Sequence, residues 1–181
     1  MIRKQDILDR AAEWRLRPEI VEKDYVLGWL LAGIATAPLG EHWIFKGGTS
    51  IRKCYFETYR FSEDLDFSLL DGAAYGQSKL LDSLCSLADR VSELSGIQLP
   101  PDAIVVRERR NLQGQPTFEG RVGYRLILHP YPDELPENAS VRTYCFNELL
   151  AEKTRALFER SRPRYRLEFS EPGPINVSLR R

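Results

Sequence analysis

Two aspartates stand at a spacing that suits metal binding on a strand. Asp64 and Asp66 belong to the run RFSEDLDFSL, whose alternation of polar and apolar residues predicts a strand over residues 61–69. Successive side chains of a strand point to opposite faces, so the two carboxylates share one face. Their repulsion would be relieved by a cation such as Mg²⁺, which prefers carboxylate and phosphate oxygens. The pattern therefore indicates a divalent-metal site.

A glycine pair upstream adds a second element of phosphate chemistry. Residues 43–45 predict a short buried strand that Gly47 and Gly48 end, and Thr49 and Ser50 can begin a helical turn. Glycines let backbone N–H groups approach a phosphate that a side chain would block. Either pair alone is weak evidence. A strand that ends in two glycines, followed by a strand with two aspartates, satisfies geometry as well as composition.

The remaining elements that must position these residues are predicted from periodicity. Helices are expected over residues 4–16, 18–37, 77–95 and 148–160, and strands over residues 104–109, 117–128 and 141–145. Helical spacing places Leu94 on the apolar face of the third helix and Leu157 on that of the fourth. The first two of these strands are expected to form a hairpin, and Asn147 to cap the last helix. From Pro163 onward periodicity is lost, which predicts a poorly ordered tail.

Two charged residues lie on or beside the apolar faces of their helices, and each has two interpretations. Asp24 is either a boundary acid paired with Lys23 or a nearby arginine, or a buried acid that orients a group in an active cleft. Lys153, near Leu149 and Ala156, is either a rim residue with an exposed ammonium group or a cation aimed into the cleft. Such a cation would neutralise charge on a triphosphate as pyrophosphate leaves.

Composition is typical of a soluble globular domain. The chain has 181 residues, of which 43% are hydrophobic and 29% charged, and its formal net charge is zero. The molecule as a whole therefore does not attract nucleic acid, and a local patch would be needed. One candidate is the segment of residues 155–166, which contains five arginines and only one acidic residue, a glutamate.

Cysteine and hydropathy patterns predict a cytoplasmic protein that does not enter a membrane. Three scattered cysteines and two isolated histidines argue against a disulfide framework and a zinc site. The N-terminus is polar and predicts no signal peptide. The longest apolar run, residues 26–37, is too short to span a bilayer.

Four segments together resemble one known family. FKGGTS, RFSEDLDFSL and AEKTRALFER, with the preceding VEKDYVLGWLL, are similar in register to the AbiEii/AbiGii-type nucleotidyltransferase toxins of the polymerase-β-like superfamily. The resemblance runs from about residue 22 to residue 163. It implies an α/β (α+β) fold with a mixed sheet flanked by helices and a short or truncated C-terminal helical part. We accordingly expect a core over residues 1–145 and a C-terminal part over residues 146–181.

The resemblance also implies an activity and partners. It predicts Mg²⁺- or Mn²⁺-dependent transfer of a nucleotide from a nucleoside triphosphate (NTP) to RNA, at the tRNA 3′ end in characterised relatives. It further predicts a cognate antitoxin, in a bacterial toxin–antitoxin or phage-defence (abortive infection) system.

Site roles carry over from the family residue by residue. The resemblance assigns nucleotide binding to Gly47, Gly48, Thr49, Ser50, Arg60 and Lys153, metal binding to Asp64 and Asp66, and catalysis to Asp64, Asp66 and Lys153. Arg60 is expected to brace the acids or to bind phosphate. Glu63 is expected to point away from the aspartates and to be structural.

Two departures from the family leave other functions open. The family commonly continues with a pattern like RDLYDL, whereas this chain has RYRLE at residues 164–168, without the aspartate and without the usual following helical domain. The strand expected near residues 122–128 carries no third acid, although Glu119 and Asp133 flank it. The alternatives are a degenerate member that binds nucleotide or a protein without catalysis, and a domain whose glycines form a turn and whose acids are solvated. Which NTP is used, and whether tRNA or protein accepts the nucleotide, stay open.

Overall fold

A computed structural model of the chain describes residues 2–70, 77–100, 104, 122–137, 139–159 and 176–180. Its helices are α1 (Lys4–Trp14), α2 (Pro18–Ala35), the 3₁₀ helix η1 (Pro38–Glu41), α3 (Gly47–Cys54), α4 (Gln77–Ser95) and α5 (Phe146–Glu159). Its strands are β1 (Trp43–Lys46), β2 (Asp64–Leu69), β3 (Val122–Leu126), β4 (Ser140–Tyr144) and β5 (Asn176–Arg180).

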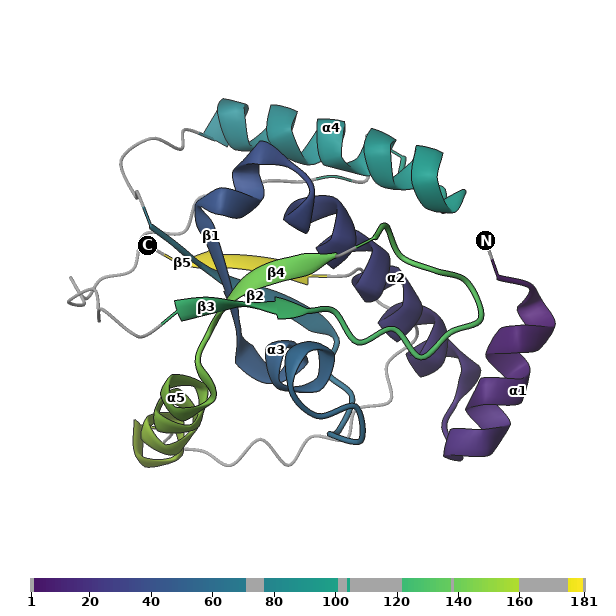
Figure 1. The fold of residues 1–181 in the computed structure, drawn as a ribbon, viewed down its shortest axis with the longest axis horizontal. Helices are drawn as coiled ribbons and strands as arrows, with labels where there is room; N and C mark the ends of the chain where they lie inside the picture. Colours follow the sequence, from purple (N-terminus) through teal and green to yellow (C-terminus); the bar gives the residue numbers. More distant parts are fainter. Residues whose placement is uncertain are drawn as a thin grey trace.

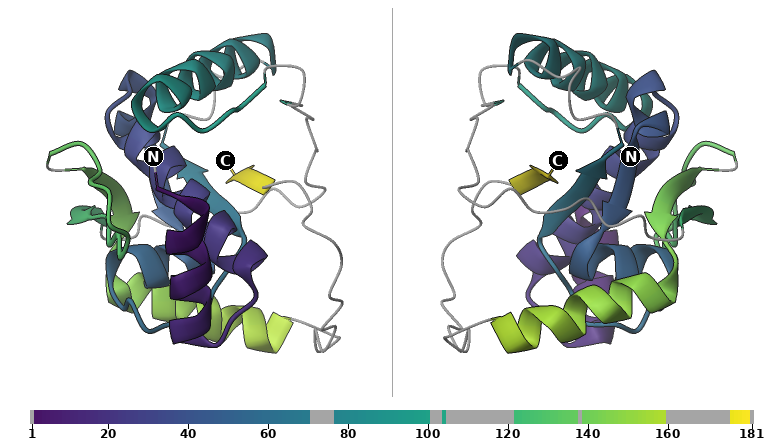
Figure 2. Two further views of the ribbon diagram at one scale, coloured as in Figure 1. Left: turned by 90° about the vertical axis from the view of Figure 1, so that its right-hand side faces the viewer. Right: turned by 90° about the vertical axis from the view of Figure 1, so that its left-hand side faces the viewer.

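The strands form one mixed sheet in the order β3-β4-β1-β2-β5. The two motif strands, β1 and β2, are antiparallel neighbours, and their register sets Lys46 opposite Asp66. β4 runs parallel to β1, β5 runs parallel to β2, and β3 is antiparallel to β4. Figure 1 shows α4 above the sheet and α3 and α5 below it, and both views of Figure 2 agree. The expected mixed α/β fold is confirmed.

The alternation predicted for β2 sets one of its faces in the core. Leu65 and Phe67 are fully buried, and the Phe67 ring packs 5.2 Å from that of Phe45 on β1. Helices α2 and α4 supply the other side of this core, with Leu31 and Val91 among their buried residues. The packed core thus holds β2 rigidly, with its aspartates on the opposite face.

Several element boundaries differ from those predicted. β2 begins at Asp64 rather than at residue 61, because the Phe61 ring packs 3.5 Å from the Arg52 guanidinium and not along the sheet. The second helix ends at Ala35. The capping role expected for Asn147 is wrong, because the Leu149 N–H already donates to the Cys145 carbonyl and Asn147 lies inside the first turn of α5.

Two leucines expected on apolar helix faces are exposed instead. Leu94 is 49% exposed at the end of α4, where the neighbouring Ser95 is buried. Leu157 is 74% exposed, whereas Leu149, two turns earlier on α5, is buried. Helical spacing predicts a common face, but each helix extends beyond the surface on which its middle or first turns pack.

The tail contains a strand that the sequence pattern did not predict. We expected residues beyond Pro163 to lack regular structure, and for residues 176–180 this is wrong, because β5 pairs with β2 along its whole length. The strand predicted at 104–109 and its turn lie outside the described residues, apart from Ile104. β3, its expected hairpin partner, pairs with β4. The division at residue 145 stays a prediction.

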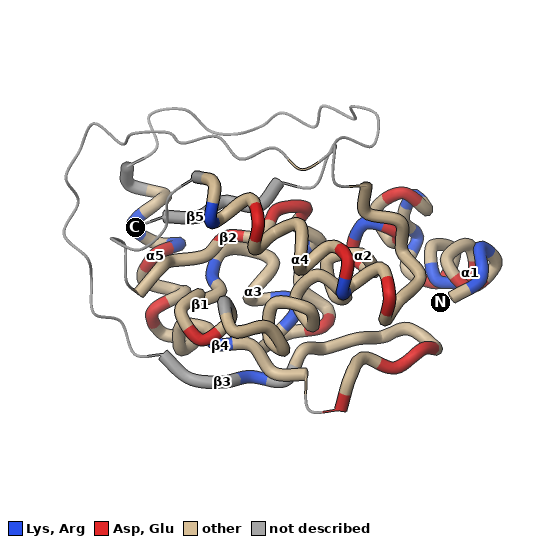
Figure 3. Tube along the Cα trace, turned by 90° about the horizontal axis from the view of Figure 1, so that it is seen from above, with Lys and Arg blue, Asp and Glu red and all other residues tan. Residues whose placement is uncertain are grey.

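Charges of both signs are interspersed along the helices in Figure 3, notably on α1 and α4. Arg155 is described, but the other four arginines of the arginine-rich segment lie outside the described residues. Among the helices that the structure describes, none is long and apolar enough to cross a membrane. All three cysteines are described, and each is a free thiol.

Candidate active site

The turn from β1 to α3 brings the glycine pair against β2. Gly47 has φ +82°, in the left-handed region that favours glycine. A Cβ atom at this position would lie 2.5 Å from Oδ2 of Asp66. Any other residue here would strain the backbone and displace the carboxylate. The two predicted motifs therefore meet directly.

Lys153 reaches the same turn from a distant part of the chain. A Cβ atom on Gly48 would lie 3.1 Å from Ser62 Oγ and 3.7 Å from Lys153 Nζ. Lys153 lies on α5 and is half-buried, and it is the position of its Nζ beside Gly48 that favours a cation aimed at the site. The structure thus brings together Gly47, Gly48, Asp66 and Lys153, as the site prediction requires.

The two aspartates lie where the core ends and the open face of β2 begins. Asp64 is exposed and Asp66 is half-buried, while the intervening Leu65 is fully buried. The predicted common face is confirmed. Within the described residues, no group of three or more histidine, cysteine, aspartate or glutamate side chains could hold a metal ion. A cation here would thus take two protein carboxylates and find its other ligands elsewhere.

The hydroxyl groups of Thr49 and Ser50 face the interior of the protein. Thr49 Oγ1 donates to the Asp64 carbonyl over 2.6 Å. Thr143 Oγ1 donates to the Phe45 carbonyl over 2.7 Å, so Ser50 Oγ is the donor in its 2.8 Å contact with Thr143. Both hydroxyls therefore fasten α3 to the sheet. Phosphate contact by these residues would fall to their backbone N–H groups.

Lys46 and Glu152 belong to the site surroundings, and the sequence reasoning missed them. Lys46 occupies the N-cap position of α3, but its side chain does not cap the helix. Its Nζ instead lies 3.5 Å from Glu152 Oε1, which links β1 to α5 one residue before Lys153. Lys46 and Glu152 each directly precede a motif residue in the sequence, and this adjacency could have marked them as neighbours of the site.

Arg60 and Glu63, two charged residues of the RFSED segment, both precede β2. Arg60 is exposed in the loop before β2. Glu63 precedes β2 and pairs with Lys23 over 2.7 Å, which agrees with the structural role expected for it. Lys23 is engaged there and does not pair with Asp24. The other partner considered for Asp24, a nearby arginine, is confirmed in Arg52.

Asp24 is buried in a cluster of charges behind the glycine turn. It accepts hydrogen bonds from Arg52 Nε at 3.1 Å, Lys53 Nζ at 2.7 Å and the Tyr131 hydroxyl at 2.8 Å. Burial by itself would raise the pKa of Asp24, but Lys53 and Arg52 outweigh that effect and hold the pKa below its usual value. Asp24 is thus a charged, fully partnered interior acid.

Asp133, one of the two flanking acids considered as a third ligand, has a structural environment. It accepts hydrogen bonds from the Tyr25 hydroxyl at 2.7 Å and Trp29 Nε1 at 3.3 Å, both on α2. His129 Nε2 lies 3.1 Å away. These contacts tie the segment after β3 to α2. Glu119, the other candidate, lies outside the described residues.

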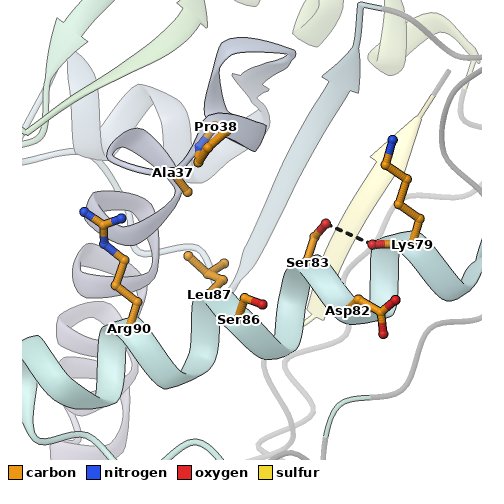
Figure 4. A pocket seen from close by; sticks show the side chains of 8 residues that line it. All are labelled: Ala37, Pro38, Lys79, Asp82, Ser83, Ser86, Leu87 and Arg90. Carbon is orange, nitrogen blue, oxygen red and sulfur yellow. Dashed lines mark hydrogen bonds between the residues drawn. The ribbon is translucent and has the colours of Figure 1, made fainter.

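A pocket of about 360 Å³ lies elsewhere on the protein, between α4 and the end of α2 (Figure 4). It is lined by Ala37, Pro38, Lys79, Asp82, Ser83, Ser86, Leu87 and Arg90. The lining contains none of the residues of the glycine–aspartate site, so this pocket is separate from that site.

Comparison with known proteins identifies the family. A family model described as the nucleotidyl transferase AbiEii toxin of type IV toxin–antitoxin systems matches residues 29–166, well over half of the 181-residue chain. The match contains every predicted site residue. Neither the curated proteins nor the solved structures searched gave a match. The sequence motifs, their convergence in the fold and this match agree, and the chain belongs to the AbiEii family of nucleotidyl transferase toxins.

Proposed function

We propose that this protein transfers a nucleotide from an NTP to RNA, at the 3′ end of tRNA, with Mg²⁺ or Mn²⁺ held by Asp64 and Asp66. The observation that carries the proposal is the convergence of Gly47, Asp66 and Lys153 from three separate elements. Transfer from a triphosphate needs close backbone approach to phosphate, carboxylates for a cation, and a positive side chain. This site combines all three.

The donor set fits a hard divalent cation. Mg²⁺ is usually bound by one or two carboxylates together with substrate phosphates and water, rather than by a complete protein cage. Asp64 and Asp66 offer two carboxylates, and among the described residues there is no third acid grouped with them. When bound, the ion would polarise phosphate oxygens and stabilise developing negative charge.

The chain's own groups would bind and orient the triphosphate. The N-terminal N–H groups of α3 and the positive end of its helix dipole favour a phosphate beside Gly48. Lys153 Nζ, near the same glycine, would balance the charge that accumulates on the leaving pyrophosphate. In the transfer, the acceptor hydroxyl oxygen bonds to the α-phosphorus and the bond to pyrophosphate breaks. The hydroxyl proton passes to solvent.

The test is transfer of label from each NTP in turn to total tRNA, with Mg²⁺ or Mn²⁺. Label on RNA should vanish in Asp64→Ala and Asp66→Ala but persist in Ser68→Ala. Ser68 lies on the same face of β2, where its Oγ accepts a hydrogen bond from the Tyr144 hydroxyl. If protein is labelled and RNA is not, the acceptor is a protein and the proposed RNA acceptor is wrong.

A binding-only function is the second candidate, supported by the absence of a third acid grouped with the site among the described residues. It predicts thermal stabilisation by an NTP with Mg²⁺, but no label on RNA or protein. If no NTP stabilises the protein and no NTP gives labelled product, both candidates are contradicted.

Membership of a type IV toxin–antitoxin family implies an antitoxin partner. We place the protein in the cytoplasm, where NTPs and tRNA are found. Three free thiols are compatible with that reducing compartment.

A further inference from the structure

Three buried charged residues join α2 to the last turn of α3, and the proposed chemistry uses none of them directly. Asp24, Arg52 and Lys53 are 2%, 4% and 1% exposed. Burying ionic groups carries a large desolvation cost, so a buried pair is weak evidence for stability by itself. The position of this cluster relative to the site suggests what it does.

The cluster holds the opposite end of the helix that begins with the glycine pair. α3 has only 8 residues, and helices this short are not stable in isolation. Gly47 and Gly48 form its first turn, while Arg52 and Lys53 lie in its last. Because one short hydrogen-bonded helix joins the two ends, contacts that hold its last turn also restrict where its first N–H groups point.

Arg52 extends the same anchor to the strand that carries the aspartates. Its Nη1 donates to the carbonyl oxygens of Glu57 and, over 2.9 Å, of Tyr59. Its guanidinium also stacks 3.5 Å from the centroid of the Phe61 ring. These loop residues lead directly into Asp64. One buried carboxylate is therefore connected to both halves of the site.

We propose that Asp24 is a positioning residue, which acts through Lys53 and Arg52 to fix the Gly47–Gly48 turn against the carboxylates of β2. Its consequence for nucleotide binding rests on the proposed function. Its effect on the turn itself does not, so the two can be tested separately.

The first test measures backbone hydrogen exchange in Asp24→Asn. The substitution keeps the shape of the side chain but removes the charge that holds both cations. Exchange at the amides of residues 47–50 should accelerate. The matched control is Asp133→Asn, which alters a half-buried acid that also contacts three side chains, two of them on α2 and none on α3. The control should leave these amides unchanged.

The second test measures binding of a non-hydrolysable NTP analogue with Mn²⁺ by calorimetry, below the unfolding temperature of every variant. Affinity should fall about 10- to 100-fold in Asp24→Asn, as for other residues that orient a metal site indirectly, and should be retained in Asp133→Asn. If Asp24→Asn does not fold, Arg52→Lys replaces it. That variant keeps a cation beside Asp24 but loses the guanidinium contacts to the loop.

Unchanged exchange and affinity in Asp24→Asn, or in Arg52→Lys where it is used, would overturn the proposal. Equal loosening of the turn by Asp133→Asn would also overturn it, because the effect would then be general destabilisation. If the wild-type protein binds no triphosphate, the proposed function fails, and the exchange measurement still decides whether Asp24 positions the turn.

Discussion

At its first residues α3 has two glycines and two hydroxyls, and at its last it has two buried cations. The first end lies beside Asp66 and Lys153, which are both half-buried. The last end is enclosed by Asp24 and Tyr131, where Lys53 is 1% exposed. A single short helix therefore has one end shaped to approach a ligand and another fastened to the interior.

The difference shows how a site with few side chains can still be precise. Glycines leave the backbone accessible but contribute no packing of their own. Precision must then come from contacts elsewhere on the helix, and in this protein it comes from buried charges and from Thr49 and Ser50. Four substitutions, described from the largest expected effect to the smallest, test the different roles of the two ends of α3.

The largest effect is expected from Asp24→Asn, which should lower the free energy of unfolding by about 3–5 kcal/mol at neutral pH by leaving buried cations unbalanced. The pKa of Asp24 is lowered in the folded protein, so its contribution is complete above the ordinary value of 3.8 and disappears as the pH falls below it. Urea unfolding from pH 7 downward should show the wild type and variant converging under acid conditions.

Glu63→Gln is the control for that measurement, because its pair with Lys23 has a carboxylate that is 57% exposed and should contribute far less. A stability difference between wild type and Asp24→Asn that stays constant across the acid range would contradict the assignment of Asp24 as a charged anchor.

Lys153→Met should next reduce kcat by about 100- to 1,000-fold, because it removes a cation beside the expected leaving group while keeping the length of the side chain. Lys79→Met, at an exposed lysine of α4 in the separate pocket, is the matched control. The assay is label transfer to RNA. Equal activity of the two variants would remove Lys153 from the site.

Gly47→Ala should reduce activity by about 100-fold, because the added methyl group would displace the Asp66 carboxylate. Gly96→Ala is the control, since Gly96 also has a positive φ, of 74°, at the end of α4. Each substitution should cost about 1–2 kcal/mol of stability through backbone strain. Similar activity in both variants would show that the contact between Gly47 and Asp66 is unimportant.

The smallest effect is expected from Thr49→Val, which should cost about 1 kcal/mol of stability by removing the hydrogen bond to the Asp64 carbonyl. The KM for the NTP should change little, because the hydroxyl faces the sheet. Thr49→Ser should restore stability. A large rise in KM for Thr49→Val alone would instead indicate that this hydroxyl binds phosphate.

Local sequence patterns predicted the parts of this fold that depend on neighbouring residues. Alternation placed Leu65 and Phe67 in the core and Asp64 and Asp66 together on the other face, as the structure confirms. The family resemblance selected Lys153, and the fold brings it to Gly48. Their roles in metal and nucleotide binding stay predictions.

Predictions from local patterns were wrong where a residue's partner is distant in the sequence, and where a helix extends beyond the surface on which it packs. Leu94 and Leu157 have the right spacing but lie beyond the packed part of their helices. Asn147 has a suitable side chain for a cap, but it lies two positions after Cys145, the residue that directly precedes α5. β5 follows a segment without periodicity, and its pairing with β2 is a long-range contact.

The sequence by itself determined a glycine turn, a strand with two aspartates on one face, and the family to which they belong. The turn and the strand follow from backbone conformational preferences and side-chain alternation, which act between adjacent residues. The family follows from the resemblance of four sequence segments and from the matching family model. Only the tertiary structure decided that Asp24 is a buried anchor for Arg52 and Lys53, and that the Thr49 and Ser50 hydroxyls serve the fold. Burial and hydrogen bonding depend on which distant segments share the interior, and no local pattern specifies that.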